Sequence, residues 1–183
     1  MLRCLHQCTN GVNDFLVSTA VLRLASPVFS CMFGASFNEG QRLHSEICPV
    51  FELHDDDPAV MELILRVLHH QSSPEDYLID AEKLARLSVY CDKYDCTRAL
   101  RAWIRIWLQT VKTMDASVEA LGFQIMAAYM FGNPLEFREI SRAATLQLPL
   151  ISAATWERDE RFELLPTSVT GKQQNFSEWM YSH

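Results

Sequence analysis

The sequence lacks the short motifs that most often carry catalysis. Its 183 residues contain no G-x-S-x-G elbow, no phosphate-binding loop of the Walker type, no H-E-x-x-H and no G-x-G-x-x-G. Gly34-Ala35-Ser36 lacks the second glycine that would let the serine occupy a strained turn. We therefore expect a protein that is not an enzyme and that uses no cofactor.

A membrane-spanning run and an excess of positive charge are also missing. The longest uncharged run, Ala120–Leu135, falls short of the ~20 apolar residues that a transmembrane helix requires. The 23 Asp and Glu outnumber the 16 Lys and Arg, and this net charge of −7 argues against binding to nucleic-acid phosphates. No positively charged, apolar leader opens the chain. We expect an intracellular protein, cytoplasmic or nuclear, that binds neither nucleic acid nor membrane.

Metal-ligating residues are present but poorly spaced. Cys4, His6 and Cys8 offer thiolate and imidazole ligands, yet one residue separates neighbours and no second pair follows. A strand edge with incidental cysteines explains them better. The carboxylates of Asp55–Asp57 suit a hard cation, whereas the adjacent Pro58 favours a helix cap. We interpret the six cysteines as reduced core residues and predict no metal site.

The stretch Phe15–Gln41 organises the N-terminal half. It opens with an extended run, Phe15–Val17, which predicts a strand followed by a short helix. Proline disfavours the helical conformation of the residue before it, so the first helix should end at Ser26. Ser26 can then cap a second helix that has Pro27 at its first position, and Gly34 should end this helix.

The remaining elements follow from turn chemistry and apolar spacing. Polar residues 38–49 predict a loop, and a short strand follows at 50–53. Asp57 should cap a helix whose apolar face is Val60, Leu63, Ile64, Val67 and Leu68. Further helices are predicted over 81–94, 100–108, 118–131 and 135–148, and a polar tail follows Pro149.

Two separated blocks carry a family resemblance. The pattern V-S-x-A-V-L-x-L-A-S-P-V-F-x-x-M-F-G-x-x-F-x-E-G-Q, at 17–41, resembles the first half of a BTB/POZ domain of the kind common in fungi. The block L-A-R-L-S-V-Y-C-D-K-Y-D-C-T-R-A-L, at 84–100, resembles the later helices of that domain. The resemblance implies an α+β fold in which residues 1–110 form a small sheet flanked by helices and 111–183 form a helical extension. Only 14 residues precede Phe15, so the N-terminal strand region is short for this family.

The resemblance implies a protein–protein interaction module. Such a module would act either by self-association, for example as a homodimer, or by docking a partner protein. An alternative is a substrate adaptor for a cullin-type ubiquitin ligase, because Phe37 and Glu39 match the hydrophobic-x-Glu element of BTB proteins that recruit a cullin scaffold. The other interpretation is that Phe37 packs back on the domain and Glu39 is solvated. A transcriptional regulator is a second alternative, although no zinc finger or basic region is present.

Two further groups have both a functional and a structural interpretation. Arg98, Arg101 and Arg105 share a helix face, which suits either a docking stripe for an acidic partner or phosphate, or a solvated surface. Because the chain is acidic overall, the solvated surface is favoured. His69 and His70 end a helix, where imidazole suits the dipole, and as sequence neighbours they point to different sides and do not chelate.

Overall fold

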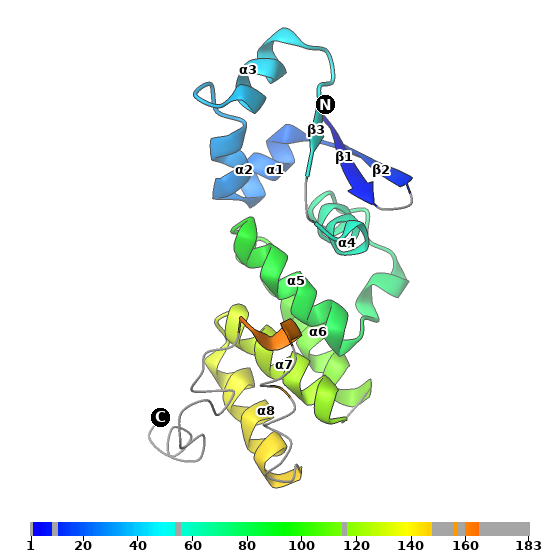
Figure 1. The fold of residues 1–183 in the computed structure, drawn as a ribbon, viewed down its shortest axis with the longest axis vertical. Helices are drawn as coiled ribbons and strands as arrows, with labels where there is room; N and C mark the ends of the chain where they lie inside the picture. Colours follow the sequence, from blue (N-terminus) through cyan, green and yellow to red (C-terminus); the bar gives the residue numbers. More distant parts are fainter. Residues whose placement is uncertain are drawn as a thin grey trace. The chain divides into compact units, whose positions relative to one another are not determined.

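The computed structural model describes residues 2–8, 11–53, 56–114, 117–147, 156 and 160–164 (Figure 1). The chain divides into two compact units. Unit 1 comprises Met1–Tyr77 and Val89–Arg105, and unit 2 comprises Leu78–Ser88 and Ile106–His183. Each unit is therefore built from two stretches of chain that alternate along the sequence.

Unit 1 contains the strands and most of the short helices. Its elements are β1 (Leu2–Cys8), β2 (Gly11–Val17), α1 (Thr19–Ala25), α2 (Pro27–Met32), α3 (Asn38–Ser45), β3 (Val50–Glu52), α4 (Pro58–Leu68) and the 3-10 turn η1 (Pro74–Tyr77). Two helices have residues in both units, namely α5 (Ala81–Lys93) and α6 (Arg101–Met114). Unit 2 also contains α7 (Val118–Met130), α8 (Pro134–Gln147) and the 3-10 turn η2 (Glu160–Phe162).

The sheet has three strands in the order β2-β1-β3. β1 pairs antiparallel with β2 and parallel with β3, so that Cys4 lies opposite Phe15 on one side and Phe51 on the other. β1 also carries His6 and Cys8. Cys4 is thus paired on both sides, which corrects the prediction of a strand edge for this residue, whereas the described register pairs His6 and Cys8 with β2 alone. Helix α4 contacts β2 and α1.

The corner between α1 and α2 forms as the sequence predicts. The Ser26 hydroxyl oxygen accepts a hydrogen bond from the Phe29 N–H at 2.9 Å, and Pro27 is the first residue of α2. Ser26 is buried, and its hydroxyl donates to the carbonyl oxygen of Tyr94 at 2.5 Å. This one serine therefore both begins α2 and attaches it to a segment 68 residues later in the chain.

The prediction of a loop over residues 38–49 is wrong, because α3 occupies most of that stretch. Its N-cap residue, Phe37, has no side chain that can cap the helix, so the usual sequence signal for a helix start is missing. At the other end, the Arg42 guanidinium donates to the Glu46 carboxylate at 2.8 and 3.1 Å. Pairs four residues apart stabilise a helix locally.

Helix α4 starts and packs as predicted. The Asp57 carboxylate accepts hydrogen bonds from the N–H groups of Ala59, at 2.9 Å, and Val60, at 3.4 Å. All five residues of the predicted apolar face are buried. Met61 and Leu65 are buried too, so α4 is covered over more of its surface than one apolar stripe requires.

The later helices form near their predicted ranges. α7 lies within the predicted range 118–131, whereas α8 begins one residue before the predicted range 135–148 and α6 ends six residues beyond the predicted range 100–108. The apolar spacing of the sequence points Leu84, Leu87, Cys91 and Tyr94 inward, and all four are buried. The same spacing points Leu100, Trp103, Ile104, Trp107 and Leu108 inward; four of these are buried, whereas Trp103 is only half-buried. The cysteine prediction is only partly right, because Cys91 and Cys96 are buried whereas Cys31 is exposed.

Unit 2 is organised around α7, in which every residue from Ala120 to Ala128 is buried. α7 packs against α8 in a helical hairpin. The buried Trp156 donates from its indole N–H to the Val118 carbonyl oxygen at 3.1 Å. Arg161 pairs with Glu119 and lies 5.1 Å from the centre of the Phe123 ring. Residues late in the sequence thus help to cover the first turns of α7.

The described residues are mostly helical and contain one small sheet in the N-terminal half, so this coarse part of the predicted architecture is present. The predicted boundary between residues 110 and 111 falls inside α6, and the division into a domain and an extension stays a prediction. Across the part of the chain that the structure describes, each helix is too short or too polar to cross a lipid bilayer.

Candidate protein-interaction site

Phe37 and Glu39 lie at the start of α3. Phe37 is the N-cap residue, and 51% of its surface is exposed. Glu39 is in the first turn and is partly buried. A Phe37 side chain packed back on the domain would be largely buried, whereas the observed one leaves half of its surface in solvent. The aromatic ring is therefore accessible to a partner.

Two glycines fix the start of α3 against the end of α2. The Phe37 N–H donates to the Gly34 carbonyl oxygen at 3.1 Å. Gly40 is buried, and a Cβ atom added to it would lie 1.9 Å from that same oxygen. No side chain fits this space, so Gly40 is required by the close approach of two backbone segments. The position of Phe37 is thereby set by backbone contacts on both sides of it.

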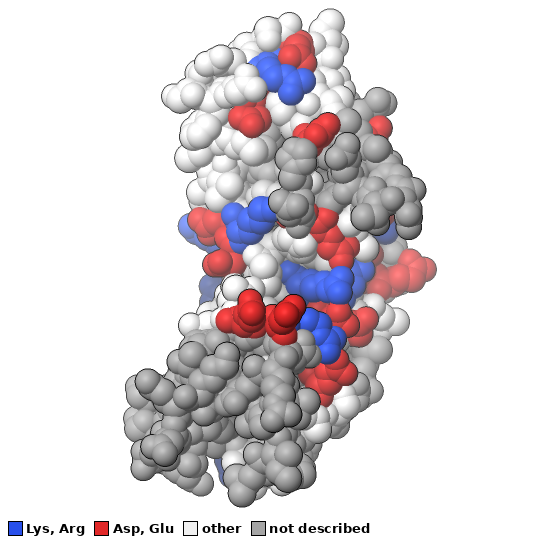
Figure 2. Space-filling view, viewed as in Figure 1, with Lys and Arg blue, Asp and Glu red and all other residues white. Residues whose placement is uncertain are grey.

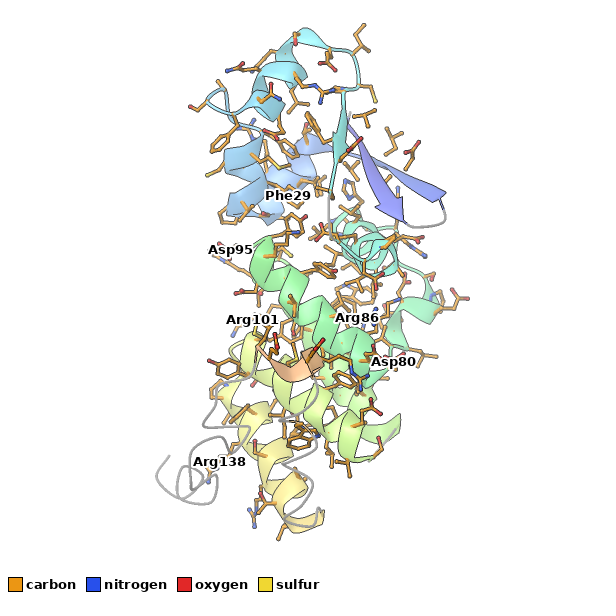
Figure 3. The ribbon with its side chains drawn as sticks, viewed as in Figure 1. Phe29, Asp80, Arg86, Asp95, Arg101 and Arg138 are labelled. Atoms are coloured by element: carbon orange, nitrogen blue, oxygen red, sulfur yellow. The ribbon has the colours of Figure 1, made fainter. Side chains whose placement is uncertain are left out.

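A column of four buried aromatic rings connects this region with α5. Its members, in spatial order, are Tyr94, Phe29, Phe33 and Phe51. The ring centroids are separated by 4.8 Å, 5.7 Å and 6.0 Å along the column. Figure 3 labels Phe29 on α2, beside the end of α5 where Asp95 is labelled. The column joins α2, β3 and the end of α5 into one rigid support.

A cation lies over each end of this column. The Lys93 ammonium group is 5.3 Å from the centre of the Tyr94 ring, and the Arg42 guanidinium is 5.0 Å from the centre of the Phe51 ring. Such cation–π contacts are typically worth about 0.5–1 kcal/mol at exposed sites. Because Arg42 belongs to α3, its contact with Phe51 also attaches the helix that carries Glu39 to the sheet.

Asp56 is a buried carboxylate, and no local sequence pattern distinguishes it from Asp57, the neighbouring cap. It forms an ion pair with Lys93 at 2.6 Å and accepts a hydrogen bond from the Tyr94 hydroxyl. The next residue, Asp57, donates its N–H to the Tyr90 hydroxyl oxygen at 2.7 Å. Burial raises the pKa of Tyr90, while the hydrogen bond from Asp57 opposes that change. These contacts attach the start of α4 to the last turn of α5.

The charges around Phe37 leave Glu39 available. The hydrogen bond from Arg42 to Glu46 raises the pKa of Arg42, and the nearby charge of Glu39 adds to that increase. The same hydrogen bond lowers the pKa of Glu46. Arg42 is therefore already paired with Glu46. Among the residues that the structure describes, Glu39 forms no ion pair.

The surface that leads up to this site carries little charge. The sequence from Phe15 to Asn38 contains one charged residue, Arg23. In Figure 2 the region of α2 is accordingly uncharged, whereas charged side chains appear over α3. Burying the apolar Phe37 ring is favourable, and few charged groups in the preceding stretch would lose water when a partner covers it.

The remaining predicted groups lie elsewhere. The side chains of Cys4, His6 and Cys8 lie outside the described residues, as does Asp55. His69 Nε2 accepts from the Ser18 N–H at 2.8 Å, and Nδ1 lies 2.8 Å from the Leu65 carbonyl oxygen. Both ring nitrogens of His69 are thus occupied. Within the described part of the chain, no group of three or more His, Cys, Asp or Glu is arranged to bind a metal ion.

Comparison with known proteins assigns no family to this chain. No protein-family model matches the sequence, and a search of curated proteins finds no match.

Proposed function

We propose that this chain is a BTB/POZ-like protein-interaction module that docks a partner protein, or a second copy of itself, through Phe37 and Glu39. The observation that carries the proposal is the Phe37 side chain, a large aromatic group that is half exposed at the start of a helix. Buried aromatic anchors dominate the binding energy of many interfaces. The fold suggested by the resemblance is one that acts by protein contacts rather than by chemistry.

Pre-organisation strengthens this interpretation. The backbone contact of Gly40 with Gly34 and the aromatic column hold the start of α3 in place before any partner binds. A rigid anchor loses little conformational entropy on association, so more of the contact energy appears as affinity. Glu39 lies two residues later and forms no ion pair with any residue that the structure describes. Its carboxylate would orient a partner that has a cationic group beside an apolar pocket.

Molar mass in solution tests the self-association form of the proposal. Light scattering on a size-exclusion column would be measured over a wide concentration range for the full chain and for Phe37→Ala. We expect a dimer whose dissociation constant rises about 30-fold in the variant, which corresponds to an anchor worth about 2 kcal/mol. A chain that is monomeric at every concentration excludes self-association and leaves docking of a different protein.

The adaptor alternative is favoured by one specific observation, the Phe37-x-Glu39 pattern on an accessible helix start. Direct titration with a purified cullin-type scaffold would test it. We expect binding that both Phe37→Ala and Glu39→Gln weaken. Ile47→Ala is the matched control, because Ile47 is a fully exposed apolar residue of the same unit. Absence of binding by the unmodified chain ends the adaptor hypothesis.

A further inference from the structure

Three exposed arginines of unit 1 recur within eight residues of sequence. No carboxylate pairs with Arg98, Arg101 or Arg105 in the part of the chain that the structure describes, whereas Arg42, Arg66 and Lys93 of the same unit each pair with one. Arg23 is also exposed and without an ion pair among the described residues, but no other cation lies near it in the sequence. The three arginines are therefore distinguished by their close spacing together with the lack of a described carboxylate partner.

These arginines do not stabilise the helix that they begin. Arg101, labelled in Figure 3, is the first residue of α6, and the first turn contains no acidic residue. The N-terminus of a helix carries a partial positive charge and favours anionic side chains. Arg98 precedes this end and Arg105 follows it one turn later. The three positive charges therefore repel one another, and those at the start of α6 interact unfavourably with the helix dipole. A purely structural role does not explain their placement.

The segment that carries Arg98, Arg101 and Arg105 is packed against the rest of unit 1. Leu100 and Ile104 are buried between the arginines along the chain, and the Trp103 ring stacks on Tyr77 with centroids 4.5 Å apart. Seven residues of helix span about 10 Å, so the three guanidinium groups originate from a fixed line of about that length. The charges are exposed, but the backbone that presents them is anchored.

We propose that Arg98, Arg101 and Arg105 form a docking stripe for an acidic helix of a partner protein. Carboxylates three to four residues apart on such a helix recur at the same spacing as the arginines, and the planar guanidinium group donates two parallel hydrogen bonds to a carboxylate. Neutralising the three charges also removes their mutual repulsion. This surface is separate from Phe37 and Glu39, and the inference does not rest on the proposed function of that pair.

A protein partner fits these charges better than a nucleic acid does. Three arginines neutralise few phosphates, and the net charge of −7 repels an extended polyanion. A short acidic helix presents its charges only along one line and so meets the arginines without approaching the acidic remainder of the chain.

Fluorescence anisotropy with the full chain would test the inference. The probe is a labelled 18-residue helical peptide with Glu at positions i, i+3 and i+7, and its control has Gln at the same positions. We expect the chain to bind the Glu peptide, and the triple variant Arg98→Gln, Arg101→Gln, Arg105→Gln to bind it about 10-fold more weakly, as for three exposed ion pairs. The variants Arg23→Gln and Arg138→Gln should leave the affinity unchanged.

Thermal unfolding of the triple variant separates binding from folding. Because the arginines oppose the helix dipole, we expect its melting temperature to be equal to or higher than that of the unmodified chain. Binding of a single-stranded oligonucleotide in preference to the Glu peptide would overturn the proposal in favour of a phosphate ligand. Equal affinity for the Glu and Gln peptides would also overturn it. Neither result bears on Phe37, which the triple variant retains.

Discussion

The two units hold their elements together in different ways. In unit 1 the column from Tyr94 to Phe51 and the buried groups of Ser26 and Asp56 connect elements that are far apart in the sequence. In unit 2 the buried residues of α7 are mostly small or aliphatic, and α7 packs against α8, the next helix along the chain. Unit 1 therefore depends on a few specific long-range contacts, whereas unit 2 combines a local helical hairpin with the contacts that Trp156 and Arg161 make to the start of α7.

Glycine is required for different reasons in the two units. Gly40 of unit 1 is needed because a side chain would collide with the backbone of Gly34. Gly132 of unit 2 has open space around it, and its φ of +62° is the reason for glycine at that position. Gly132 ends α7 in a Schellman motif, in which its N–H and that of Asn133 bond back to Tyr129 and Ala128.

The largest expected effect comes from breaking the aromatic column. Phe29→Ala removes the ring that lies between Tyr94 and Phe33, and we expect the free energy of unfolding to fall by about 3–5 kcal/mol, because the site cannot collapse around the cavity. Ile125→Val in α7, also fully buried, should cost only about 1 kcal/mol. Urea unfolding followed by circular dichroism measures both. A smaller loss for Phe29→Ala than for Ile125→Val would refute the importance of the column.

An intermediate effect is expected at Gly40. Gly40→Ala places a methyl group against the backbone of Gly34, and overpacking of this kind costs about 1–3 kcal/mol. Because the strain is relieved by moving α3, binding through Phe37 should weaken more than the stability loss alone explains. The dissociation constant for the partner, or for the homodimer, would be measured at a temperature where the variant remains folded. Unchanged stability would show that the two backbone segments separate easily.

The smallest effects are expected at the helix ends. α5 ends in the same motif as α7, but with Asp95 at φ +46° in place of glycine. Gly132→Ala should cost about 1 kcal/mol. Asp95→Gly should instead stabilise the chain by about 0.5 kcal/mol, because it removes both a strained conformation and a negative charge at a helix C-terminus. Melting temperatures that shift in the same direction for both variants would contradict this explanation.

The sequence predicted the elements whose signals are local. Ser26-Pro27 and Asp57-Pro58 combine a cap with a proline that suits the first turn, and the structure forms both helix starts with the expected hydrogen bonds. The apolar spacing of α4 to α8 likewise depends on neighbouring residues only. Such elements need no knowledge of what they pack against.

The prediction failed where the cause lies in the folded backbone or far along the chain. Helix α3 was missed because its polar composition and its glycine suggest a loop, and the reason for Gly40 is visible only when Gly34 is beside it. Asp56 looked like part of a cap because its partners, Lys93 and Tyr94, follow 37 and 38 residues later. The exposure of Phe37 is likewise a property of the folded chain. The candidate site could be located from the sequence, but its accessibility could not.

The alternation of the two units along the chain has a consequence for synthesis on the ribosome. Leu78–Ser88 leaves the ribosome before the second part of unit 1, yet the rest of its own unit begins only at Ile106. Unit 1 can be completed once Arg105 has emerged, while the first piece of unit 2 has to wait for the following helices. A fragment ending near residue 110 would therefore retain Leu78–Ser88 without its packing partners, and would expose apolar residues such as Leu84 and Leu87 that the whole chain buries.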